Sequence, residues 1–92
     1  MKPALDELLE RSLPADVEEQ ILAIISSEPA VSKPHNLRTR RIGRAIEIDC
    51  HIRLDGALSV VESHEITRRI EGCLREKYGE GTIIMLHVEP IK

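Results

Sequence analysis

A histidine and a carboxylate stand two residues apart near the C-terminal end, as His87 and Glu89. They belong to a segment of β-branched and apolar residues that opens after Gly81 and closes at Pro90, which predicts a β-strand over residues 82–89. Side chains alternate between the faces of a strand, so His87 and Glu89 share one face, roughly 6.5–7 Å apart. Nitrogen and oxygen ligands each lie about 2 Å from zinc. The pair can therefore grip one metal ion from two sides.

Two further strands must position any other ligands. Residues 45–54 alternate strictly, with Glu47, Asp49, His51 and Arg53 on the polar face, which predicts a half-buried antiparallel strand. Residues 34–41, which include His35, are more polar and predict an exposed or edge strand. The apolar faces, which should meet the core, carry Ile46, Ile48, Cys50, Ile52 and Leu54 on the middle strand and Ile84, Leu86 and Val88 on the last.

Helices are predicted over residues 14–27, with Pro14 at the favoured first position, and over residues 59–78. The second helix opens with a capping box, Ser59 and Glu62. Its apolar stripe consists of Ile66, Ile70, Cys73 and Leu74. The order helix, strand, strand, helix, strand predicts an α+β, ferredoxin-like αββαβ fold, with a three-stranded sheet and both helices on one face. Residues 1–13 are expected to form a linker-like N-terminal helix before a single domain at residues 14–92.

The uncovered face of this sheet holds the candidate ligands. If the outward faces of the strands meet at one end of the sheet, His35, His51, His87 and Glu89 come together. Three imidazoles and one carboxylate suit zinc, and also cobalt, nickel or iron(II), whereas the lack of an outward cysteine argues against copper(I). His64, in the first turns of the second helix, could join from the same subunit or from a partner. Solvated histidines on an exposed sheet are also common, so spacing alone is equally compatible with a face that binds no metal.

Composition excludes several functions. The net charge of −3 and the single aromatic residue argue against nucleic-acid binding by Arg38, Arg40, Arg41 and Arg44, which are expected to lie on a solvated edge strand. We recognise no signal peptide, and no apolar run approaches the 18–20 or so residues that span a bilayer. Both cysteines are expected to be reduced core residues of a cytosolic protein. We recognise no phosphate-binding glycine loop and no arrangement of a nucleophile with a base, so the sequence does not indicate an enzyme.

Four motifs together resemble the C-terminal cytoplasmic domain of the cation diffusion facilitator transporters, which export zinc, iron, cadmium or manganese. The motifs are H-N-L-R-T-R-R from His35, I-D-C-H-I from Ile48, L-S-V-V-E-S-H from Leu58 and H-V-E-P from His87. The resemblance covers residues 13–90.

The resemblance implies a metallochaperone-like fold, a V-shaped homodimer and a divalent metal near its interface. Its ligands would be His35, His51, His64, His87 and Glu89, with zinc as the first expectation and cadmium, cobalt, iron, nickel or manganese as alternatives. Many members of the family have aspartate where this chain has Glu89, which bears on geometry and metal preference. The resemblance also implies a cytoplasmic location and a transmembrane half as partner, without which this chain cannot transport ions.

Our hypothesis is a metal-sensing module. Outward acids, Glu47, Asp49 and Glu89, would repel across a two-fold interface until a bound ion drew the subunits together. Affinity should fall below about pH 6, because imidazole must be unprotonated to bind. Two alternatives remain: a small-molecule-binding regulatory module of the same topology, and a purely structural dimerisation domain without a metal response.

Overall fold

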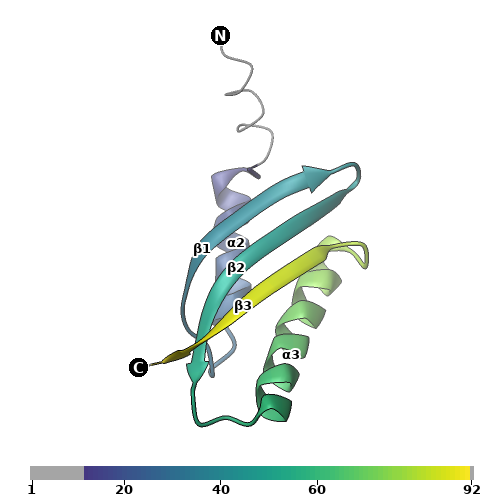
Figure 1. The fold of residues 1–92 in the computed structure, drawn as a ribbon. Coiled ribbons are helices and arrows are strands. Elements are labelled where there is room, and N and C mark those ends of the chain that lie inside the picture. Colours follow the sequence, from purple (N-terminus) through teal and green to yellow (C-terminus); the bar gives the residue numbers. More distant parts are fainter. Residues whose placement is uncertain (1–11, 92) are drawn as a thin grey trace.

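The computed structural model describes residues 12–91, and the N-terminal helix expected before them lies almost entirely outside the described residues. Helix α2 (Ala15–Ser26) leads into a hairpin of strands β1 (Ser32–Ile42) and β2 (Ala45–Asp55). Helix α3 (Val60–Tyr78) then returns the chain to strand β3 (Ile83–Ile91) (Figure 1). No helix among these residues is both long and apolar enough to cross a membrane.

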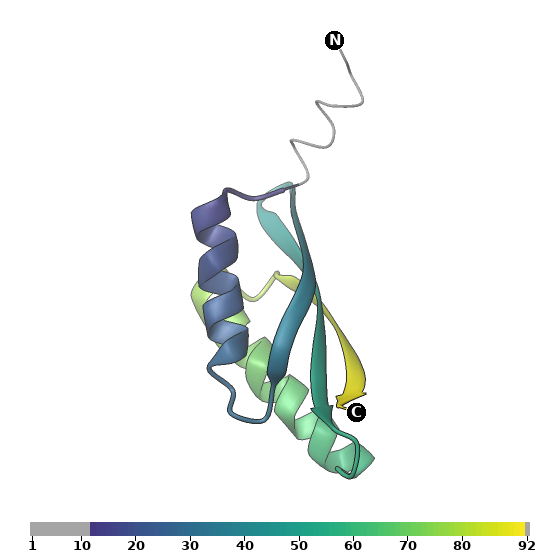
Figure 2. The ribbon, with the colours of Figure 1, turned by 90° about the vertical axis from the view of Figure 1, so that its left-hand side faces the viewer.

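The three strands form one mixed sheet in the order β1-β2-β3. Strand β1 runs antiparallel to β2, as their two-residue turn requires, and β3 runs parallel to β2 because α3 carries the chain back along the sheet. Both helices lie on the same side of the sheet, and the other side is uncovered (Figure 2). The α+β, ferredoxin-like αββαβ fold is thereby confirmed.

An aliphatic core fills the space between the sheet and the helices. Its fully buried members come from α2, β2 and α3, and the largest are Ile21, Ile25, Ile48, Ile52, Leu54 and Leu74. Leu13, which precedes α2, is also buried in this core. The predicted capping box starts α3, since the Ser59 hydroxyl accepts from the Glu62 N–H at 3.0 Å and the Glu62 carboxylate accepts from the Ser59 N–H at 2.9 Å.

Three expectations about the core and β3 were wrong. Cys73 is exposed, because it flanks the buried stripe of α3 rather than lying in it; Cys50 is buried, as expected, and both thiols are free. Val88 remains 44 % exposed although it lies on the helix-facing side of β3. This strand is at the sheet edge, and the cover of its apolar face ends before Val88. The strand also continues through Pro90 to Ile91, which an edge strand tolerates because one side needs no ladder hydrogen bonds.

Candidate metal centre

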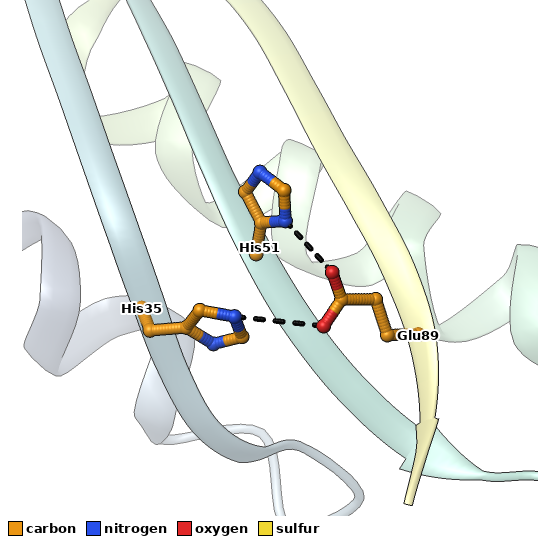
Figure 3. Close-up of side chains that lie close together, drawn as sticks. All are labelled: His35, His51 and Glu89. Atoms are coloured by element: carbon orange, nitrogen blue, oxygen red, sulfur yellow. Dashed lines mark hydrogen bonds and ion pairs between the residues drawn. The ribbon is translucent and has the colours of Figure 1, made fainter.

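Strands β2 and β3 bring the candidate ligands His51 and Glu89 together. In their parallel register His51 lies opposite His87, and Arg53 lies opposite Glu89. Glu89 reaches back along the strand, so that its Oε2 lies 2.9 Å from Nδ1 of His51. Figure 3 shows both Glu89 oxygens directed toward imidazoles, one from β2 and one from β1. The sequence prediction that this face carries imidazoles and a carboxylate agrees with this arrangement.

His35 reaches the same face through an irregularity in β1. Arg38 lies opposite Asp49, and His35 lies opposite His51. The same interval therefore contains three residue steps in β1 and only two in β2. Asn36, inside this interval, has a φ of +54°. One extra residue in a strand is a β-bulge, and it reverses which face the following side chains occupy. His35 therefore points outward although Thr39, an even number of residues away, is buried against the helices.

The first group of possible ligands consists of His35, His51 and Glu89, one from each strand. One donor atom from each lies within 4.8 Å of the others. Nε2 of His35 is 3.5 Å from Oε1 of Glu89. Ligands at about 2.0–2.1 Å in a tetrahedral zinc site are about 3.3 Å from one another, so small side-chain movements would place this group around an ion. The three side chains are 30–39 % exposed, which leaves room for a further ligand.

A second group consists of Asp49, His51 and His87, whose donor atoms also lie within 4.8 Å of one another. Nε2 of His87 is 2.9 Å from Oδ1 of Asp49, and the rings of His51 and His87 stack with centroids 4.6 Å apart. Sequence reasoning placed Asp49 on this face but did not count it as a ligand. The signal was its position two residues before His51, on the same side of β2. His51 belongs to both groups.

The acids of this face have cationic or imidazole neighbours. Oε1 of Glu89 is 3.7 Å from Nε of Arg53, and Oε1 of Glu47 is 2.6 Å from Nε of Arg40. The pKa of Glu89 lies below its ordinary value, chiefly because the His51 ring donates a hydrogen bond to it; the charges of protonated His35 and His51 and of Arg53 lower it further, against a smaller effect of burial. Mutual repulsion of the outward acids is therefore weaker than the sequence alone suggested.

Cys50 and His64 do not lie on the outer face of the sheet. The Cys50 thiol lies on the buried side of β2, where burial raises its pKa to about 11. It donates to the His35 carbonyl oxygen at 3.6 Å and cannot present a thiolate to the outer face. His64 is exposed on α3, on the helical side of the sheet, and is in neither group. Within one chain, the structure brings together four of the five expected ligand residues and leaves His64 aside.

Comparisons with known proteins agree with the fold. The profile of the family described as "Cation efflux protein, cytoplasmic domain" matches residues 13–91. The cation-efflux pump FieF of Serratia proteamaculans is 34% identical over 87 residues, which are 95% of this chain and 29% of that protein. The chain thus spans less than a third of the curated relatives it matches.

Solved structures are similar over most of the chain. The candidate zinc transporter CzrB superposes with a TM-score of 0.80 at 28% identity, over 88% of this chain and 100% of that one. The metal-bound C-terminal domain of the CzcD transporter from Thermotoga maritima gives a TM-score of 0.73 at 33% identity, over 98% of this chain and 94% of that one. The chain therefore belongs to the family of cation efflux protein cytoplasmic domains.

Proposed function

We propose that this chain is the metal-sensing and dimerisation domain of a divalent-cation efflux transporter, and that zinc is its ligand. The observation that carries the proposal is the convergence of His35, His51 and Glu89, one from each strand, on a single point of the uncovered sheet face. Two imidazoles and a carboxylate, with an open fourth position, form a donor set that suits zinc. Cobalt, nickel, iron(II), cadmium and manganese are the alternatives that a titration separates.

The two ligand groups limit how many ions one subunit can hold. Each group needs His51, and a neutral imidazole has one unprotonated nitrogen, which binds one ion. The chain's own residues therefore offer one three-ligand site at a time, either with Glu89 or with Asp49 and His87. A second ion requires a ligand from elsewhere. His64, exposed and on the helical side of its own subunit, is our choice for a ligand supplied by a partner copy.

Dimerisation through the uncovered face is supported by its apolar content. Ile83 and Met85 precede His87 on the outward side of β3 and remain 43 % and 41 % exposed. These side chains adjoin the proposed ligands, so a partner subunit would bury them and complete the coordination together. A bound ion would then favour the arrangement in which both subunits lie close to it. The proposal also includes a membrane-spanning part, whose activity would respond to this change in the arrangement of the subunits.

Zinc titration of chelator-treated protein by calorimetry tests the proposal. We expect saturable binding in the wild type, and severe loss in His51→Ala, because that residue belongs to both groups. Glu89→Gln keeps the size of the side chain but removes its charge, and should weaken binding strongly. Glu28→Gln is the matched control, since Glu28, in the loop after α2, pairs with Arg69 at 3.0 Å and should leave zinc binding unchanged.

A parallel measurement of molecular mass in solution, with and without zinc, separates the remaining candidates. A zinc-dependent dimer or a zinc-dependent change in its compactness supports a sensor. A dimer that ignores zinc, together with no heat in the titration, would leave the structural dimerisation domain. A domain that binds amino acids or nucleotides but not zinc would correspond to the small-molecule regulatory alternative.

A further inference from the structure

The turn between β1 and β2 forms a basic surface that the metal site does not use. Arg41 and Arg44 flank it and are exposed, and Ile42 between them is 41 % exposed. Gly43, with a φ of +59°, makes the tight turn possible. We call Arg41, Ile42 and Arg44 the basic tip. Within residues 12–91, neither of its arginines forms an ion pair, whereas the nearby Arg40 is held by Glu47 at 2.6 Å.

The basic tip lies at the end of the domain where the described chain begins. The N–H of Leu13 donates to the Thr39 hydroxyl at 3.0 Å, and that hydroxyl donates to Glu18 at 2.6 Å. Thr39 is two residues before Arg41, so these bonds fix the start of the fold beside the base of the hairpin. Figure 1 shows the β1–β2 turn and the start of α2 at the same end of the molecule. The proposed metal ligands lie farther along the strands, away from the turn.

Position and chemistry together identify a partner. This inference rests on the proposed function: in CzcD the corresponding part is the C-terminal domain of a transporter, so a membrane-spanning part would precede residue 12 here and the basic tip would face the membrane. Guanidinium groups bind phosphate oxygens in a fork geometry, and an apolar side chain between them can enter the headgroup region. We propose that the basic tip binds anionic phospholipid headgroups at the membrane surface.

Acids at the same end limit the strength of this contact. Asp16 and Glu18 lie in the first turn of α2, and Glu80 precedes Gly81, whose backbone lies beside Ala45. Glu18 is engaged by Thr39. Binding by the isolated domain should therefore be weak, salt-sensitive and dependent on both arginines of the tip. Each basic residue near an anionic surface contributes roughly a fivefold increase in partitioning, so loss of both should reduce partitioning about 25-fold.

Vesicle sedimentation tests the proposal with the chelator-treated chain, so that its outcome is independent of zinc binding. We expect binding to vesicles of equal parts phosphatidylcholine and phosphatidylglycerol at low salt, and none to phosphatidylcholine alone. The double variant Arg41→Gln/Arg44→Gln should lose most of this binding. The control variant Arg68→Gln/Arg69→Gln removes the same charge from α3 and should bind within about twofold of the wild type, since long-range charge alone changes partitioning little.

A fluorescence measurement reports the contact directly, because the chain contains no tryptophan. In Ile42→Trp the emission should shift to the blue on anionic vesicles, and in Val61→Trp, at the start of α3, it should not. Equal binding to both vesicle types, undiminished binding by the tip variant, or no binding to anionic vesicles would overturn the proposal. In the last case the tip arginines would be free to meet acidic protein loops instead. A failed zinc titration would leave this result untouched.

Discussion

Arg53 should oppose metal binding at the site with which it is in contact. Its Nε lies 3.7 Å from Oε1 of Glu89, and its side chain is 51 % exposed. Replacement by glutamine in Arg53→Gln removes the positive charge and retains a polar side chain of moderate length. Glu89 is ionised at neutral pH, because its pKa lies below the ordinary value of a glutamate. Loss of the arginine should therefore not cost the site its carboxylate.

The size of the effect follows from the contact distance. An ion about 2 Å beyond the Glu89 oxygen would lie about 5 Å from the guanidinium group. Coulomb's law in water gives a repulsion of roughly three times RT between a unit and a double positive charge at that separation, and physiological salt about halves it. The Arg53→Gln variant should therefore bind zinc about fivefold more tightly than the wild type.

Competition titration against a zinc-binding dye measures this difference. Arg69→Gln is the control, because Arg69 of α3 pairs with Glu28 at 3.0 Å and lies outside both ligand groups. The gain in Arg53→Gln should shrink as salt is added, since the repulsion it relieves is screened. Equal or weaker zinc binding in Arg53→Gln would show that the arginine orients Glu89 for the ion rather than repelling it, and the electrostatic reasoning would be refuted.

Three further measurements follow from burial and charge. Because the folded-state pKa of Glu89 is lowered, its ionised form stabilises the fold above about pH 4.5, and that contribution is lost as the pH falls through the lowered value; calorimetry of the metal-free protein should show the Tm deficit of Glu89→Gln vanish in acid. A thiol reagent at mildly alkaline pH should modify exposed Cys73 rapidly and Cys50, with its pKa of about 11, only after denaturation; two fast equivalents would contradict this. Leu74→Ala removes a fully buried side chain and should cost about 2–5 kcal/mol in urea unfolding. Val61→Ala, at a position 66 % exposed, should change stability by less than about 0.5 kcal/mol.

The elements whose apolar period is uninterrupted could be predicted from sequence. In β2 every second residue from Ile46 to Leu54 is buried, as its alternation requires. The capping box fixed the start of α3 because both of its reciprocal hydrogen bonds are local in sequence. With these elements and their order, the outward position of His51 followed directly.

Contacts between strands were harder to predict, because they depend on register. Whether Glu89 meets His51 or Arg53 is decided by how β3 is shifted along β2, and alternation alone is compatible with several shifts. In the structure Glu89 contacts both. The inclusion of Asp49 with His87 has the same origin, since they lie two residues apart in register and meet diagonally across the two strands.

The position of His35 depends on backbone conformation rather than on residue pattern. The regular alternation of Leu37 and Thr39 extrapolates back to an inward His35, and the bulge at Asn36 reverses it. Asparagine tolerates a positive φ better than most residues, but it does so in turns as well as in bulges. No local signal in the sequence therefore distinguishes this bulge from a regular strand.

The bulge in β1 allows a one-residue change in chain length without the loss of a ligand. Deleting Asn36 would restore the two-residue repeat between His35 and Arg38, and the His35 imidazole would stay on the outer face, opposite His51. A regular strand of the present length would instead turn this imidazole toward the helices. In alignments of related chains, a one-residue gap at this point therefore leaves the inferred coordination number unchanged.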